Sequence, residues 1–521
     1  MQLYALLNFI GFLTSFLSSH PYVLLLFLSL EINHPMKTHF IYFLLLAILL
    51  PGYASATQAM KRNVVFILSD DHRFDFMGFT GKLPWLNTPH MDNMAERGVY
   101  FDQAYVTTSL CSPSRASILT GLYAHTHTIV DNQAPNPGNL TYFPEYLQEA
   151  GYQTAFFGKW HMGDDSDDPQ PGFHHWESFK GQGVYTGVTL NINGEHTSYE
   201  DTVYTSDLLT EHAVEWMEQL ESDQPFFVYL SHKAVHSQFK QAARHAGMYE
   251  GVDYELPATY SQTQDDSYKD LLWPEWVKEQ RHSWHGVDYM YHGNGAVGDL
   301  VIDYCETLMG VDESIGTVMA YLEARGIADE TVVIYMGDNG FSWGEHGLID
   351  KRHFYEESAK VPLLVTCPDL FEGGETLHSL VQNIDIAPTV MAMAGLEKTP
   401  KMHGDSFLPL LVGKEVPWRD KVFYEYYWEY DFPMTPSVCG VRTDRYKLIR
   451  YHGLWERNEL YDLQSDPNEM YNLIEHPEHQ ELIRELAGEI YDWLESSGGM
   501  QIPLKRTIKH RWGDYRHSEQ Y

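Results

Sequence analysis

The sequence NVVFILSDD, at residues 63–71, is the strongest indication of the fold class. An apolar run of strand length here ends directly in polar residues, among them the carboxylates Asp70 and Asp71. Continuous apolar runs of this kind suit strands that are buried on both faces of a parallel sheet. Three further segments have the same form: TAFF at 154–157 runs into GKWH, PFFVYL at 225–230 runs into SH and then His236, and TVVIYM at 331–336 runs into GDNG.

Helical patterns lie between these strands, at residues 139–150, 205–221 and 298–325. Strands that alternate with helices predict an α/β sandwich. In such folds ligands bind beyond the carboxyl ends of the parallel strands, which is where all four polar clusters would lie. A single Asp-Asp pair after a strand is commonly a solvated turn, but four polar clusters at four strand ends predict convergence on one site.

The last part of the chain predicts a small α+β subdomain. Residues 380–411 predict a helix and a loop that leave the large domain. They are followed by a hairpin over 440–451 with its turn near Thr443 and Asp444, a strand near 460–462 and a helix over about 477–496. We therefore expect a large N-terminal domain over 57–385 and a C-terminal subdomain over 386–521.

The amino terminus predicts an export signal. A positively charged residue precedes an apolar run at 40–50, and YASA at 53–56 ends in an A-x-A cleavage pattern. We expect translation from Met36 and cleavage after Ala56, so that residues 1–56 form a signal region and the mature protein is periplasmic or secreted. The alternative is a membrane anchor made of one or both apolar runs, but the second run is short for a span. We therefore expect no stable membrane anchor.

The net charge narrows the choice of partners. The chain has 521 residues, with 35 Lys and Arg against 72 Asp and Glu, for a formal charge of −37. Nucleic-acid binding needs a basic surface, so this balance argues against it. With 44% hydrophobic and 21% charged residues, the composition is that of a globular protein. Four cysteines in a chain of this length cannot form a disulfide framework: Cys111, Cys305, Cys367 and Cys439.

The segment CSPSRASILTG at 111–121 is the most informative motif. Residues from Pro113 onward predict the start of a helix, which would place Cys111 at the positive end of that helix beside Arg115. Such surroundings favour an anionic group at position 111. A small buried cysteine near a helix cap is the alternative interpretation, and the segment alone leaves both open.

Taken together, the motifs resemble those of the type I sulfatases of the alkaline phosphatase superfamily. Cys-x-Pro-Ser-Arg followed by Ala-Ser-x-Leu-Thr-Gly is similar to the signature of that family, and the resemblance runs from about Asn63 to about Asn472. It implies an alkaline-phosphatase-like α/β sandwich with a smaller C-terminal α+β subdomain. The resemblance rests on Asp70-Asp71, CSPSRASILTG at 111–121, GKWH at 158–161, DNG at 338–340, Lys351 with Tyr355-Glu356, and ELYD at 459–462 with Asp466-Pro467.

The resemblance implies a divalent-metal site and a modified nucleophile. Asp70, Asp71, Asp338 and Asn339 match the family's metal ligands, and an oxygen of the modified Cys111 would complete the set. These are hard oxygen donors, which suit Ca²⁺ or, less well, Mg²⁺ and argue against zinc. Cys111 matches the cysteine that is oxidised to formylglycine (3-oxoalanine), so a formylglycine-generating enzyme is an implied partner. One hydroxyl of the aldehyde hydrate would attack sulfur to form a sulfate ester, and the other would then expel sulfate.

The resemblance also gives roles to the charged residues. Lys159 and Lys351 match the cations that bind the sulfate group, and Arg115 matches the residue that stabilises the hydrate and the metal shell. His236 aligns with the general acid that protonates the leaving alcohol, and His161 with the base that helps the hydrate expel sulfate. The chain departs from the family pattern after His236, where it reads Ser-Gln and relatives commonly have a proline.

Export and the resemblance imply a sulfated carbohydrate as the substrate rather than a lipid or a steroid. The segments at 226–239 and 351–362 look like those of bacterial polysaccharide and glycosaminoglycan sulfatases. A very acidic exported protein suits salty water, so an algal polysaccharide such as ulvan, or its oligosaccharides, is one expectation. Four residues beside the motifs are candidates for a sugar subsite, with ordinary loop or capping roles equally open: Arg73, Asp75, His353 and His403.

Two other functions stay open at this point. A phosphonate monoester hydrolase or phosphodiesterase of the same superfamily would share the cysteine signature, since phosphoryl and sulfuryl transfer need similar cations. A non-catalytic binder of sulfated glycans is the second alternative, but a binder has no reason to keep Cys111, Lys159 and His161. The sequence therefore predicts a sulfuric ester hydrolase that releases inorganic sulfate.

Overall fold

A computed structural model describes residues 61–162, 166–221, 224–261, 271–290, 295–453 and 456–501. The predicted signal region at 1–56 lies outside these residues, so export, cleavage after Ala56 and a start at Met36 stay predictions. Within the described residues, no helix is both long enough and apolar enough to cross a membrane.

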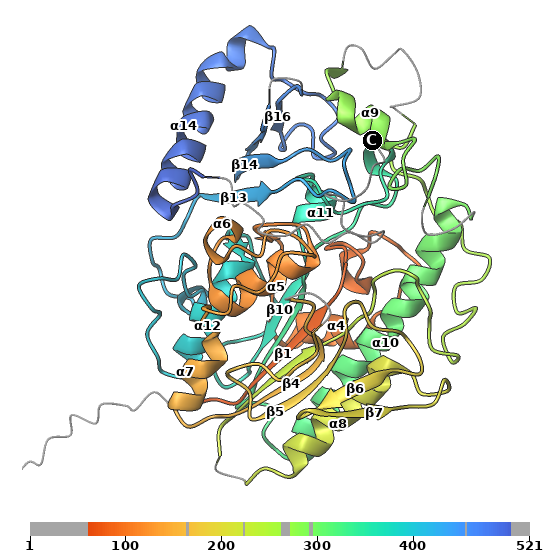
Figure 1. Ribbon diagram of the computed structural model, residues 1–521, viewed down its shortest axis with the longest axis vertical. Helices are drawn as coiled ribbons and strands as arrows, with labels where there is room; N and C mark the ends of the chain where they lie inside the picture. Colours follow the sequence, from red (N-terminus) through yellow and green to blue (C-terminus); the bar gives the residue numbers. More distant parts are fainter. Residues whose placement is uncertain are drawn as a thin grey trace, which may run out of the picture. The chain divides into compact units, whose positions relative to one another are not determined.

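The described part of the chain is built on a ten-stranded sheet (Figure 1). Its central strands β9, β1, β8, β4 and β5 pair in parallel. Toward one edge β10 is antiparallel to both β9 and β2, and at the other edge β5, β6 and β7 pair antiparallel. In spatial order the strands are β11 (Glu375–Leu377), β2 (Val99–Phe101), β10 (Leu363–Thr366), β9 (Val332–Gly337), β1 (Val64–Ser69), β8 (Phe226–Ser231), β4 (Gln153–Lys159), β5 (His175–Phe179), β6 (Thr189–Ile192) and β7 (Glu195–Ser198).

The four strands predicted from the apolar runs are confirmed, as β1, β4, β8 and β9. They are neighbours in the order β9, β1, β8, β4 and all point the same way. Each strand continues into the first polar residues, because the parallel pairing persists there: Ser69 is in register with Gly337, and Gly158 with Ser231. The four polar clusters therefore begin at one edge of the sheet.

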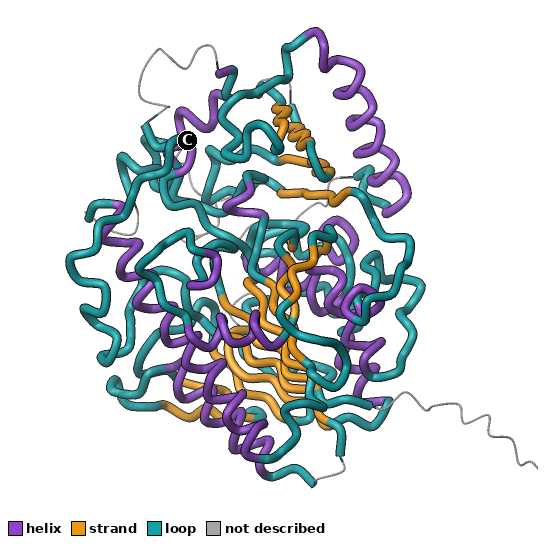
Figure 2. Tube along the Cα trace, turned by 180° about the vertical axis from the view of Figure 1, so that it is seen from behind, coloured by secondary structure: helices purple, strands orange, loops and turns teal. Residues whose placement is uncertain are grey.

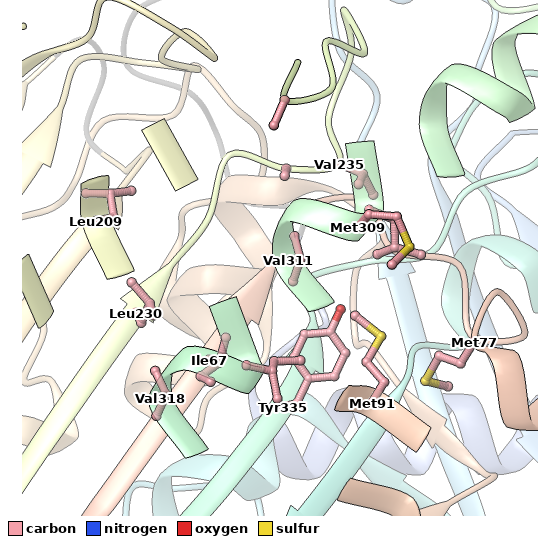
Figure 3. Packing of buried hydrophobic residues seen from close by; sticks show 14 of the residues in the cluster. Ile67, Met77, Met91, Leu209, Leu230, Val235, Met309, Val311, Val318 and Tyr335 are labelled. Carbon is pink, nitrogen blue, oxygen red and sulfur yellow. The ribbon is translucent and has the colours of Figure 1, made fainter. Parts of the chain in front are cut away.

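Helices cover both faces of the sheet (Figures 1 and 2). Ile67 of β1 packs toward one face, whereas its neighbour Phe66 packs toward the other. Figure 3 shows the first core, where Ile67 and Tyr335 lie beside Met91 and Val318. This core contains α4 (Pro89–Arg97), α8 (Thr205–Glu218) and α10 (Val297–Ala324), and the opposite core contains α5 (Cys111–Thr120), α7 (Phe143–Glu149) and α12 (Ile386–Met393). The predicted α/β sandwich is confirmed.

The three helices expected between the strands are present, as α7, α8 and α10. The first of them begins later than the predicted residue 139. Pro144 lies in the first turn of α7, and the carboxylate of Glu145 accepts a hydrogen bond from the backbone N–H of Tyr142 at 2.8 Å. Because a proline and a reciprocal cap both favour a helix start, α7 begins at Phe143.

A four-stranded antiparallel sheet forms the C-terminal part, with α14 against it (Figure 1). The predicted hairpin corresponds to β14 and β15, the predicted strand to β16 and the predicted helix to α14. Leu486, Ile490 and Trp493 of α14 pack against Val441 and Leu448 of the sheet, so that one face of the helix is buried. The bounds are β13 (Lys421–Tyr426), β14 (Val438–Thr443), β15 (Tyr446–Tyr451), β16 (Glu459–Asp462) and α14 (Gln480–Ser497).

The segment expected to leave the large domain stays attached to it. Ile386 and Val390 of α12 are buried in the core on the α5 and α7 face of the large sheet. The domain division at residue 385 thus remains a prediction. Short elements complete the described chain: β3 (Ala104–Tyr105), β12 (Val381–Gln382), α6 (Ala124–His127), α9 (Glu275–Gln280), α11 (Glu356–Ala359) and α13 (Leu408–Leu411).

The C-terminal part holds the loop at 350–356, which precedes and enters α11. Arg352 Nε donates to Glu429 Oε1 at 2.7 Å, and Glu429 follows β13. Lys447 Nζ of β15 donates to the backbone carbonyl of Phe354 at 2.8 Å. All of these side chains are buried. The loop that carries Lys351 is therefore fixed by residues from the far end of the sequence.

Candidate active site

One side chain joins three of the four predicted strand ends. Arg115, on α5, places Nε and Nη2 at 2.9 and 2.7 Å from Oδ2 of Asp338, after β9. Its Nη1 donates to the carbonyl of Lys159 at 2.7 Å, at the end of β4, and to Ser231 Oγ at 2.6 Å, at the end of β8. The clusters predicted to converge do meet at this edge of the sheet.

Cys111 is the first residue of α5, so the helix begins two residues before the predicted start at Pro113. Leu110 before it is extended, with φ −158° and ψ 138°, and the helix ends at Gly121, whose φ of 69° an L side chain rarely adopts. The Cys111 Sγ lies 3.1 Å from Lys351 Nζ and 3.5 Å from Asp70 Oδ1. The helix thus carries a buried sulfur atom into the cluster of charged residues.

Of the two interpretations that the segment left open, the buried cysteine describes the unmodified thiol better. Burial, with the charge of Asp70 adding to it, raises the pKa of the Cys111 thiol to about 12, although Lys159 and Lys351 oppose the shift. Loss of hydration outweighs the helix terminus and the two ammonium groups. At neutral pH this thiol is protonated.

Three buried carboxylates form a group that suits a cation. Asp70, Asp71 and Asp338 each offer an oxygen, and these atoms lie within 4.8 Å of one another. Asn339 donates Nδ2 to Asp71 Oδ1 at 2.7 Å, whereas its own Oδ1 is buried and has no hydrogen-bond partner among the described residues. Hard oxygen donors, one of them unsatisfied, are what Ca²⁺ takes as ligands. The residues predicted as ligands therefore lie together in a donor set that fits a hard divalent cation.

Both predicted sulfate-binding lysines lie at this group. Lys159 Nζ pairs with Asp70, and Lys351 Nζ pairs with Asp71. Both ammonium groups are almost completely buried. Lys159 Nζ also donates to Gln182 Oε1 at 2.5 Å, a contact that the sequence did not predict. Gln182 comes from the loop after β5, and only its glycine-rich surroundings distinguish it in the sequence.

Both predicted histidines reach the same cluster. His236 Nε2 lies 3.9 Å from Asp71 Oδ2, and the ligating atoms of His236 and Cys111 lie within 4.8 Å of each other. His161 Nδ1 lies 3.5 Å from Oγ of Ser112, the residue after Cys111. Burial holds the pKa of both imidazoles well below the usual range, and the nearby lysine ammonium groups act in the same direction.

The sequence also missed Lys233, three residues before His236. Its ammonium is buried, donates to the backbone carbonyl of Ser237 at 3.1 Å and lies 4.8 Å from the ring centroid of Tyr185. A lysine in SHKAVH gives no signal by itself, since a lysine after a strand is ordinarily solvent-exposed.

The four candidates for a sugar subsite have partners within the protein. Arg73 is buried and pairs with Asp75 at 2.6 Å and with Glu345 at 2.5 Å. His353 lies 3.2 Å from Ser342 Oγ. His403 stacks on the ring of Tyr123, with 5.1 Å between ring centroids, and its Nδ1 accepts from the Tyr123 N–H. These contacts favour the ordinary structural roles that the sequence left open.

The other three cysteines are buried and unpaired: Cys305, Cys367 and Cys439. Cys305 lies on α10 and packs in the core on that face of the large sheet, and Cys439 lies in β14 of the C-terminal sheet. Among the described cysteines, Cys111 alone lies in a cluster of ionisable side chains that could hold a metal.

The fold and this cluster define a hydrolase of the alkaline phosphatase superfamily. Residues 62–396 match the family model described as Sulfatase, and residues 344–496 match the one described as the C-terminal region of N-sulphoglucosamine sulphohydrolase. The chain belongs to the sulfatase family, and the type I sulfatase resemblance is confirmed. Its class of activity is therefore hydrolysis of sulfuric esters.

Individual relatives are similar over most of the chain. An N-acetylglucosamine-6-O-sulfatase of Bacteroides thetaiotaomicron is 31% identical over 82% of this chain and 85% of its own length. The multifunctional alkaline phosphatase superfamily protein PehA of Trinickia caryophylli is 27% identical over 88% of this chain and 98% of its own. A solved structure in complex with its substrate D-glucosamine-2-N,6-O-disulfate is 28% identical, with a TM-score of 0.77 over 86% of this chain and 100% of that chain.

Proposed function

We propose that the protein removes sulfate from a sulfated amino sugar, with a 6-O-sulfated N-acetylglucosamine unit as its substrate class. Two relatives support this choice, one named as an N-acetylglucosamine-6-O-sulfatase and the other solved with a glucosamine disulfate. The C-terminal match to N-sulphoglucosamine sulphohydrolase agrees with an amino sugar. Ulvan oligosaccharides, which lack amino sugars, are the contrasting substrates in the test below.

The nucleophile in this proposal is Cys111 after oxidation to formylglycine by a maturation enzyme. The observation that carries the proposal is the position of this side chain, at the start of α5 and 3.1 Å from Lys351 Nζ. The hydrate of the aldehyde supplies two hydroxyls on one carbon, one for attack on sulfur and one for release of sulfate. Sulfate leaves with its S–O bond to the sugar broken, so the sugar keeps its own oxygen as an alcohol.

In this proposal the carboxylates hold a cation, and the cation and the lysines together stabilise the negative charge of the sulfate group. Asp70, Asp71, Asp338 and Asn339 would hold Ca²⁺, which supplies positive charge against the sulfate oxygens and the nucleophile when it is bound. Lys159 and Lys351 are buried cations that would face the non-bridging oxygens of sulfate. Arg115 keeps the carboxylate of Asp338 in place through two contacts to one oxygen.

The two histidines act as the general acid and the general base of the proposed reaction. His236, whose Nε2 faces the carboxylate cluster, would give a proton to the leaving sugar oxygen. His161, next to Ser112 at the start of α5, would take a proton from the second hydroxyl when sulfate is expelled. Export to the periplasm or the medium belongs to the same proposal, supported by the signal pattern at 40–56.

The test combines mass spectrometry and sulfate release. Protein made together with a formylglycine-generating enzyme is digested, and the peptide with Cys111 is weighed. The same protein is incubated with N-acetylglucosamine-6-sulfate and with ulvan oligosaccharides, and free sulfate is measured by ion chromatography. We expect the aldehyde mass and sulfate from the amino sugar only. Sulfate from ulvan alone would overturn the substrate class, and sulfate release by protein that keeps the thiol would overturn the nucleophile.

A second activity is favoured by one observation, the match to the multifunctional superfamily protein over 98% of that protein's length. Hydrolysis of a phosphonate monoester would use the same lysines and metal ligands. Phenyl phosphonate esters are therefore included in the assay, and we expect their turnover to be slower than that of the sulfated sugar. A faster rate on the phosphonate would make this chain a phosphonate monoester hydrolase.

A further inference from the structure

The loop that follows β8 contains an ammonium group in an unusual place. Lys233 is only 5% exposed, and no described carboxylate lies within 4.0 Å of its Nζ. Burial of a lysine ammonium without a carboxylate partner costs free energy. Most lysine ammonium groups therefore face solvent or pair with a carboxylate at the surface. Desolvation and the like charge of Lys159 lower the pKa of Lys233 to about 8. The contacts of this ammonium group should therefore show what it does for the protein.

Those contacts converge on the residues around His236. The carbonyl oxygen of Ser237 accepts a hydrogen bond from Lys233 Nζ at 3.1 Å, and it lies 2.7 Å from His236 Nδ1. A carbonyl oxygen can only accept, so His236 Nδ1 must carry the hydrogen of this contact. The hydrogen bond therefore fixes the imidazole with Nδ1–H toward Ser237 and Nε2 toward the reacting group.

Tyr185 contacts the same loop at two points. Its ring lies 4.8 Å from Lys233 Nζ, and its hydroxyl donates to the backbone carbonyl of His236. The carbonyls of His236 and of Ser237 are thus each bonded by a buried side chain, one by Tyr185 and one by Lys233. Two consecutive carbonyls fixed in this way leave the imidazole little freedom to turn.

We propose that Lys233 is a positioning residue for His236. The proposal rests on the proposed function, in which His236 protonates the leaving sugar oxygen. By holding the Ser237 carbonyl, Lys233 keeps the Nδ1–H bond in place and so aims Nε2. For this step His236 must be the imidazolium, which takes its second proton, on Nε2, from solvent when the anionic sulfate binds beside it. When the S–O bond to the sugar breaks, that Nε2 proton moves to the sugar oxygen, and the hydrogen on Nδ1 stays bonded to Ser237. The neutral imidazole left behind is then the Nδ1–H tautomer, which is the one that the carbonyl stabilises.

The first test reads the tautomer without substrate. Nitrogen NMR of protein labelled at histidine gives separate signals for protonated and unprotonated ring nitrogens, and a His236→Asn sample identifies the His236 signals by their loss. We expect neutral His236 in the Nδ1–H form, and a mixture of tautomers in Lys233→Met. An unchanged tautomer in Lys233→Met would overturn the positioning role.

The second test uses the leaving group. A sugar alcohol leaves only when protonated, whereas 4-nitrophenolate leaves without a proton. We expect Lys233→Met to lower kcat on N-acetylglucosamine-6-sulfate by about 10²-fold, as expected for a misplaced acid, and to change kcat on 4-nitrophenyl sulfate by less than about threefold. Lys233→Arg, which keeps a donor for Ser237, should recover most of the loss. Equal losses on both substrates, or a rise in KM alone, would overturn the proposal.

Two further variants complete the design. Lys240→Met removes an exposed ammonium from the same loop, where it donates to Thr186 Oγ1 at 2.8 Å, and it should leave both rates unchanged. Tyr185→Phe deletes only the hydroxyl that donates to the His236 carbonyl. If Lys233→Met does not fold, this variant still tests whether the hydrogen bonds to the loop carbonyls position His236. It too should slow the sugar substrate selectively. Failure of the wild-type enzyme on the amino sugar would refute the proposed function, while the NMR result would still decide the role of Lys233.

Discussion

Arg115 and Asp338 meet through two nitrogens and a single oxygen, at 2.9 and 2.7 Å from Asp338 Oδ2. Both side chains are buried, at 2% and 0% exposure. The pair ties α5, which carries Cys111, to the carboxyl end of β9, which carries two of the proposed metal ligands. The position of the nucleophile relative to the cation site therefore depends on this contact.

Removal of Arg115 should destabilise the protein strongly. Arg115→Met leaves the carboxylate of Asp338 buried without its guanidinium partner, so we expect a loss of about 3–5 kcal/mol in the free energy of unfolding. Urea denaturation followed by fluorescence measures it. Arg97→Met is the matched control, because Arg97 pairs with Glu323 on the surface, where such pairs contribute about 1 kcal/mol or less. Similar losses in the two variants would contradict the structural role given to Arg115.

Cys111→Ala should abolish sulfate release, because alanine cannot be converted to the aldehyde. We expect a fall in kcat of roughly 10⁴-fold or more, the scale seen when a covalent nucleophile is removed. The control is Cys439→Ala, which changes a buried cysteine of the C-terminal sheet. It should cost some stability but keep the rate. A Cys111→Ala enzyme that keeps a tenth of the activity would refute the proposed nucleophile.

Calcium removal should lower both activity and stability. Asp70, Asp71 and Asp338 repel one another when they are charged, and a bound cation relieves that repulsion. Differential scanning calorimetry with EGTA and with added Ca²⁺ measures the effect, which is about 2.7 kcal/mol when free calcium is one hundred times its Kd. Asp338→Asn should weaken this response. An enzyme with the same melting temperature and the same rate in EGTA would have no functional calcium site.

Stability should fall on the alkaline side through one pair far from the site. His212 Nδ1 of α8 lies 2.6 Å from Glu177 Oε2 of β5, and this hydrogen bond raises the pKa of His212. A folded pKa above the unfolded value, about 6.5, means that the contribution is complete below that pH and is lost as the pH rises through the folded pKa. His212→Gln should therefore flatten the decrease in unfolding free energy above about pH 6.5. Parallel curves for the wild type and the variant would exclude this pair as the cause.

Much of the site could be predicted because the chemistry lies at strand ends. The runs that form β1, β4, β8 and β9 are long, apolar and bounded by polar residues, so their positions and their common edge could be predicted from local patterns. Cys111 could be placed at a helix start from Pro113 and the residues after it. Local patterns were sufficient for both conclusions.

What could not be predicted depends on contacts between distant segments. Gln182 reaches the cluster, and Lys233 bonds the Ser237 carbonyl beside His236, from loops with no periodic pattern. Arg73 pairs with Glu345, 272 positions away. The sequence left the charge state of Cys111 open, because its burial depends on how the carboxyl ends of several strands pack around it. Burial of that kind is a property of the assembled fold, which no single segment reveals.

The hydrogen bonds from the C-terminal part position the loop at 350–356, and this limits how such enzymes can diversify by recombination. Lys351 is followed by Arg352, which donates a hydrogen bond to Glu429. Two residues further on, the carbonyl of Phe354 accepts one from Lys447. A recombination event that exchanged only the C-terminal sheet and α14 would separate these partners and displace a cation from the reaction centre. Productive chimeras with relatives should therefore need the loop and the C-terminal sheet from the same parent, which makes the two a single heritable unit.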